Sequence, residues 1–65
     1  MAYEELLGKR ILLFFDDLGR PMKKTGRLLA ISEGFLHIKE DGGADGKIRD
    51  LLISVSKVLR VEIVD

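Results

Sequence analysis

The residues that could carry out catalysis are few. The chain has no cysteine, and His37 is its only histidine. A Ser-His-acid arrangement would have to use Ser32, Ser54 or Ser56, and none of these stands in a glycine-flanked nucleophile turn. A structural zinc site needs four Cys or His ligands, which this chain does not have. We therefore predict a protein that is not an enzyme, with no catalytic residue, no metal site and no cofactor.

Positive charge gathers in one segment of an otherwise neutral chain. Eleven Lys and Arg residues balance eleven Asp and Glu residues, which gives a net charge of zero. The segment contains Arg20, Lys23, Lys24 and Arg27, with no acid between them. It could bind phosphates, because neutralised phosphates supply most of the non-specific affinity for nucleic acid. The alternative is that these side chains protect an exposed strand edge from unwanted pairing.

Phe35 and His37 are two further candidates for contact with RNA. Phe35 directly follows a predicted turn, where its ring can lie at the surface and stack on a base instead of filling the core. Together with the basic segment these residues form the candidate RNA-binding set. Its members are Arg20, Lys23, Lys24, Arg27, Phe35 and His37.

The elements that must position these residues are predicted to be short strands. Glu4 and Glu5, followed by Gly8, indicate a helical turn or two over residues 3–7. Branched and aromatic residues, or an alternation of apolar and polar residues, predict five strands after that turn. These strands cover residues 9–16, 22–31, 35–40, 48–55 and 58–64, the first of them buried on both faces. A helix bundle is excluded, because no window keeps a 3.6-residue apolar period for three turns.

The connections between the predicted strands are short. Residues 17–21 and 32–34 have the composition of turns, and residues 41–46, with three glycines, predict a flexible loop. Gly26, in the middle of the second predicted strand, indicates a bend or a bulge. The pattern predicts a single domain over residues 1–65, in the form of a small, strongly bent antiparallel barrel.

The length of the chain predicts an oligomer. A domain of 65 residues has a marginal core, and neither disulfides nor zinc can reinforce it here, so partner subunits are the expected source of stability. The longest apolar run, residues 11–15, is too short to span a bilayer. The acidic start of the chain lacks the basic region of a secretory signal, so we expect a cytoplasmic protein with no membrane association.

This layout resembles the Sm-like family of small barrels. Residues 26–38 keep the glycine, leucine and apolar positions of the family stretch G-x-L-x-G-x-D-x-x-hydrophobic-N-hydrophobic. Residues 53–61 match the length of the second stretch, I-R-G-x-x-V-x-x-I. The resemblance implies a short N-terminal helix, a five-stranded SH3-type barrel and a role in RNA metabolism. It also implies a homo-oligomeric ring, in which the fourth strand of one subunit pairs with the fifth strand of the next.

The positions that build the uridine pocket of the family hold different residues in this chain. They are Ser32, Gly34, Leu36 and Ser54, none of which can stack on a base or form a charged clamp. A one-residue slip would instead place Glu33, Phe35 and His37 there, which restores an acid, an aromatic and a polar residue in the right order. Two functions remain open. One is an oligomer that binds single-stranded RNA, and the other is an oligomeric protein-interaction or structural module that does not bind nucleic acid.

Overall fold

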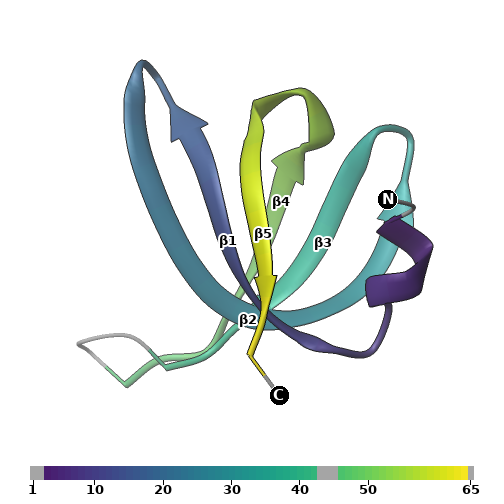
Figure 1. The fold of residues 1–65 in the computed structure, drawn as a ribbon. Coiled ribbons are helices and arrows are strands. Elements are labelled where there is room, and N and C mark those ends of the chain that lie inside the picture. The colour runs from purple at the N-terminus through teal and green to yellow at the C-terminus, as the bar shows by residue number, and fades with distance from the viewer. Residues whose placement is uncertain (1–2, 43–45, 65) are drawn as a thin grey trace.

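The structure is a computed structural model that describes residues 3–42 and 46–64, and it consists mainly of one antiparallel sheet (Figure 1). Its elements are η1 (Tyr3–Leu6), β1 (Arg10–Asp17), β2 (Arg20–Ser32), β3 (Phe35–Glu40), β4 (Arg49–Ser54), η2 (Val55–Lys57) and β5 (Val58–Ile63). The strands lie side by side in the order β4-β3-β2-β1-β5. The prediction of a mainly β fold with five antiparallel strands is therefore confirmed. No helix in the described part of the chain is long and apolar enough to cross a membrane.

The predicted N-terminal helix is only a single 3-10 turn. It covers four residues, and the chain leaves it at Gly8, which has a φ of +79°. So short a segment cannot offset the entropy of nucleating an α-helix. The turn nevertheless matters for packing, because Leu6 is buried and covers one end of the core.

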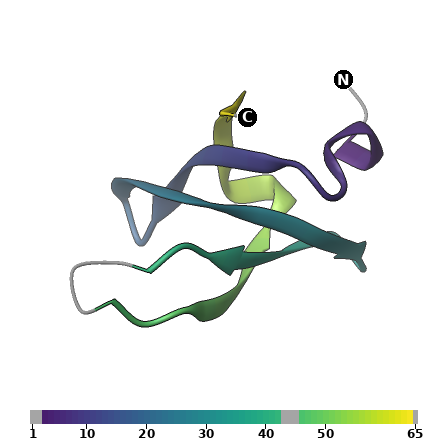
Figure 2. The same cartoon turned by 90° about the horizontal axis from the view of Figure 1, so that it is seen from below.

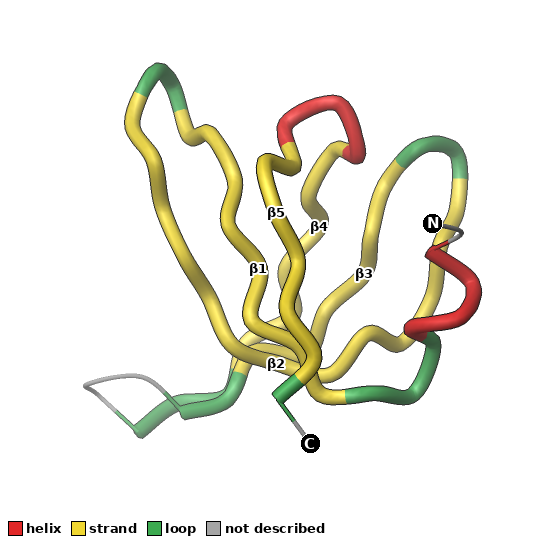
Figure 3. The backbone as a smooth tube through the Cα atoms, in the orientation of Figure 1, coloured by secondary structure: helices red, strands yellow, loops and turns green. Residues whose placement is uncertain are grey.

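Within the single chain, the strongly bent sheet does not close into the predicted barrel. β4 and β5 are the two edges of the sheet, and no pairing joins them within residues 3–42 and 46–64. The three residues of η2 carry the chain from one edge to the other. As Figure 3 shows, η2 lies at the same end of the molecule as the β1–β2 and β2–β3 turns. The sheet is therefore strongly curled but open.

Several predicted boundaries shift by a residue or two. Arg20 and Pro21, which were predicted to lie in a turn, are the first residues of β2. The turn consists of Leu18 and Gly19 alone, and both residues have a positive φ. β3 begins and ends where predicted. Of the predicted flexible loop 41–46, residues 43–45 lie outside the described residues.

The core lies on the inner face of the curled sheet. Its buried side chains come from η1 and the first four strands, and they are Leu6, Ile11, Leu13, Leu28, Leu36, Ile38 and Ile53. β1 is not buried on both faces as predicted. Leu12 and Phe14, on its other face, are only half-buried. Seen from below in Figure 2, β2 passes between the β1 side and the β3 side of the sheet, so one long bent strand shapes both walls of the core.

A β-bulge at Leu29 sets the pairing of β2 with β3. Near the turn, Ser32 pairs with Phe35 and Ala30 with His37, but beyond the bulge Leu28 pairs with Ile38. Leu29 is thus an extra residue on β2, the feature that defines a bulge. Of the bend or bulge predicted at Gly26, the bulge is not found, because Gly26 pairs in regular register with Glu40.

Gly26 has a different role, which is to allow a close approach of backbones. A Cβ atom at this position would lie 2.5 Å from the Lys39 carbonyl oxygen and 2.8 Å from Ile38 Cγ2. The nearest obstacle is backbone, which cannot rotate away as a flexible side chain would. Glycine is therefore required where β2 bends against β3.

We predict that Gly26→Ala destabilises the fold by about 1–3 kcal/mol, because the added methyl group overpacks the contact with β3. Urea denaturation followed by circular dichroism measures this loss. Thr25→Ala, on the neighbouring residue of the same strand, is the matched control. Equal stability of the Gly26→Ala variant and the wild type would contradict the assigned role of Gly26.

Candidate nucleic-acid interface

The predicted basic segment is divided between the two faces of β2. Lys24 pairs across the sheet with the buried Leu13, so it lies on the inner face, and alternation along the strand puts Arg20 on the same side. Lys23 pairs with Phe14 and Arg27 with Arg10, and these residues lie on the outer face. The four cations therefore do not form one surface.

Two of the four predicted cations are held within the chain. Lys24 Nζ lies 3.0 Å from Glu40 Oε2, and Glu40, only 6 % exposed, is the one buried charged residue in the described part of the chain. Arg27 Nη1 donates a hydrogen bond to the carbonyl oxygen of Gly8. Arg27 thus helps to hold the link between η1 and β1 against β2.

Phe35 and His37 both lie on the outer face of β3. Their neighbours Leu36 and Ile38 are buried on the other face. Phe35 is 45 % exposed, because the residues directly across from it, Ser32 and Ser54, are both small.

The side chain of His37 is close to an acid on the neighbouring strand. His37 Nε2 lies 3.7 Å from Asp50 Oδ1 of β4. Leu52, directly opposite His37, is also largely exposed. The outer face of β3 therefore presents an open aromatic ring next to an imidazole group.

The two segments that carry the Sm-like resemblance meet in space. The amide of Val55, at the start of η2, donates a hydrogen bond of 2.8 Å to the carbonyl oxygen of Gly34 in the β2–β3 turn. Ser54 Oγ and Ser56 Oγ are 2.8 Å apart. Glu33, at the tip of the turn, is exposed and has a φ of +52°. An acid, an aromatic ring and two hydroxyl groups thus gather near one end of the sheet.

Sequence reasoning missed a row of three cations across the outer face. Arg10 of β1 is the direct partner of Arg27, and Arg27 is the direct partner of Lys39 on β3. Like charges placed directly opposite one another destabilise a sheet. The sequence does not show that these cations are neighbours, because a hairpin without a bulge after the Glu33-Gly34 turn would pair Arg27 with Glu40 and not with Lys39.

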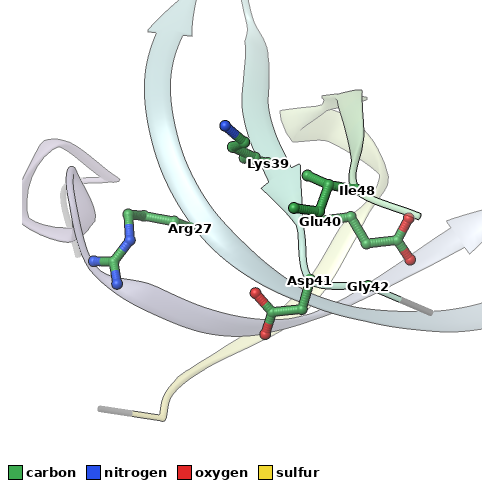
Figure 4. Close-up of a pocket in the computed structure, with 6 residues that line it drawn as sticks. All are labelled: Arg27, Lys39, Glu40, Asp41, Gly42 and Ile48. Carbon is green, nitrogen blue, oxygen red and sulfur yellow. The ribbon is translucent and has the colours of Figure 1, made fainter. Parts of the chain in front are cut away.

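A shallow hollow of about 230 Å³ lies beside this row of cations (Figure 4). The residues that line it are Arg27, Lys39, Glu40, Asp41, Gly42 and Ile48. The Glu40 carboxylate, which pairs with Lys24, extends away from Arg27 and Asp41 in Figure 4. Asp41 Oδ2 accepts a hydrogen bond of 2.8 Å from Arg10 Nε. The hollow therefore has cations from two strands on its wall, together with two carboxylates that are both already paired.

The described part of the chain contains no cluster of three or more His, Asp or Glu side chains that could hold a metal ion. Comparison with known protein families, curated proteins and solved structures finds no match to this chain.

The ion pair between Lys24 and Glu40 gives a prediction about stability. Lys24→Met keeps the apolar stem and removes the charge, which leaves a buried carboxylate without its partner. We expect the free energy of unfolding, measured by urea denaturation, to fall by about 1 kcal/mol. The loss is at the low end for such a change because the Lys24 side chain is 35 % exposed.

Two further variants test the cause of that loss. Adding Glu40→Gln to Lys24→Met should recover part of the stability, because the uncompensated charge is then gone. Lys23→Met, on the other face of the same strand, is the matched control. If both single lysine variants lose the same stability, the ion pair contributes nothing specific.

Proposed function

We propose that this chain is a non-catalytic Sm-like protein that forms a cyclic homo-oligomer and binds single-stranded RNA. The observation that carries the proposal is the outer face of β3, where Phe35 is open to solvent and His37 lies two residues further along the same face. An exposed aromatic ring on a sheet is the element on which single-stranded bases stack.

Charge on the neighbouring strand supports this proposal. Lys23 lies on the outer face of β2 and makes no ion pair within the described residues. Arg27 lies further along β2 on the same face. These cations share the outer face of the sheet with Phe35, although Arg27 pairs with Lys39 and neither cation is a direct partner of the ring. A positively charged surface holds the nucleic-acid backbone in sites where the bases stack on aromatic rings. Arg20 and Lys24, on the inner side of β2, are less suited to this role.

The bulge supports the slipped alignment with the Sm-like stretch. One extra residue in β2 shifts the second half of the motif by one position relative to the first. His37 then takes the place of the asparagine in the hydrophobic-N-hydrophobic pattern, between Leu36 and Ile38, which are both buried. Glu33 and Phe35 correspondingly take the places of the aspartate and the aromatic residue.

The free edges of the sheet support the proposed ring. Four large apolar side chains on or beside β4 and β5 are more than half exposed, and they are Ile48, Leu52, Leu59 and Ile63. Unpaired edges with apolar side chains are templates for pairing with another chain. If β4 of one copy pairs with β5 of the next, every edge is paired once the ring closes.

The second candidate function is an oligomeric interaction module that does not bind nucleic acid. The observation that favours it is that Lys24 and Arg27 are engaged by Glu40 and by the Gly8 carbonyl oxygen. Both candidates share the proposed assembly and differ in the use of the outer face. Binding measurements separate them.

Titration with labelled oligo-U, oligo-A and duplex DNA at two salt concentrations tests the RNA proposal. We expect binding to single strands that weakens steeply with salt, because phosphate contacts release counterions. Phe35→Ala should weaken binding by fivefold or more, since stacking of one base is worth about 1–3 kcal/mol. Lys23→Gln should lower the salt slope by about 0.7.

The matched control is Leu18→Ala, which removes another exposed apolar side chain, in the β1–β2 turn away from β3. This variant should bind like the wild type. If none of the three probes binds at low salt, the RNA proposal is rejected and the interaction module remains. Equal losses in Phe35→Ala and Leu18→Ala would reject the assignment to Phe35.

A further inference from the structure

We infer that the hollow lined by Arg27 and Lys39 is a binding site for a phosphate group, held by these two cations. The two cations are direct partners on neighbouring strands, about 4.8 Å apart at the backbone, and both line the hollow. Such a pair is unfavourable while no anion lies between its members. A phosphate oxyanion would supply the missing negative charge, and the guanidinium group suits its geometry.

Within residues 3–42 and 46–64, no carboxylate is bonded to Arg27 or Lys39. Asp41 is bonded to Arg10, the third cation of the row, and compensates that charge. Within the described residues, Arg27 has the neutral carbonyl oxygen of Gly8 as its partner and no carboxylate. Lys39 makes no ion pair within the described residues, although Asp50 is its cross-strand partner. In the part of the chain that the structure describes, these two neighbouring cations therefore have no carboxylate bonded to either.

The register explains why these cations meet at all. Without the bulge at Leu29, Arg27 would pair with Glu40 and its charge would be satisfied inside the sheet. The bulge moves Glu40 opposite Gly26, where it is buried against Lys24, and moves Lys39 opposite Arg27. One extra residue in β2 thus turns an expected ion pair into a pair of like charges at the surface.

This site shares Arg27 with the proposed RNA-binding set but does not depend on RNA binding. A free phosphate needs neither the Phe35 ring nor an assembled ring of subunits. The backbone phosphate of an RNA strand would present the same oxyanion to the two cations. The two sources of the phosphate group are distinguished by competition. The site exists if inorganic phosphate binds, whatever the result with RNA.

The test is a titration of the isotope-labelled chain with inorganic phosphate at constant ionic strength, followed by backbone amide shifts in the NMR spectrum. We expect saturable shifts centred on Arg27 and Lys39. Lys39→Gln should weaken phosphate binding about threefold, as should Arg27→Gln, because each removes one exposed charge contact. Asp41→Asn should instead tighten binding about twofold, because Arg10 is then released toward the hollow.

Lys57→Gln, which removes a charge from the exposed η2, is the matched control and should bind phosphate like the wild type. Oligo-U that displaces phosphate identifies the RNA backbone as a source, and oligo-U that does not displace it identifies a free phosphate. Shifts that fail to saturate would overturn the inference. Equal weakening by Lys57→Gln and Lys39→Gln would overturn it as well, because binding would then follow net charge alone.

Discussion

The bulge at Leu29 is the constraint on which the rest of this small sheet depends. It changes the register of β2 against β3 by one residue, and a change of one residue moves every following side chain to the other face. With the bulge, Leu28 and Ile38 meet in the core and Gly26 lies against the β3 backbone. Without it, Arg27 would face Glu40 and the buried position of Leu28 would be lost.

The curled sheet that results has a small core and two free edges. Among the described residues, seven buried apolar side chains, one of them from the η1 turn, fill the inner face. Several large apolar side chains remain exposed along β4 and β5. Domains of this size expose much of their surface even when folded. The same geometry that leaves the edges unpaired in one chain makes them available to a second copy.

The sequence predicted the strands well because their signals are local. Turn residues and alternation located all five, and β3 was placed to the residue, since the Glu33-Gly34 turn and the buried Leu36 and Ile38 leave little choice. The bulge could not be predicted, because residues 28–31 are all apolar and give no alternation from which to read a register. The row of Arg10, Arg27 and Lys39 depends on that register, so the sequence did not predict it either.

The candidate site was predicted in part. Phe35 is exposed beside a turn, as its position in the sequence suggested, and His37 shares its face. The basic segment was predicted as a unit, but alternation along β2 divides it, and Glu40 engages Lys24 from a position 16 residues further along the chain. Contacts across that separation depend on tertiary pairing, which local composition does not encode.

Sedimentation velocity at micromolar concentration directly tests whether neighbouring copies pair the free β4 and β5 edges. We expect a species several times heavier than the 7.3 kDa chain. Ile63→Lys, at the β5 edge, should dissociate it, whereas Leu18→Lys, in the distant β1–β2 turn, should not. A wild-type protein that sediments only as a 7.3 kDa monomer would contradict the account.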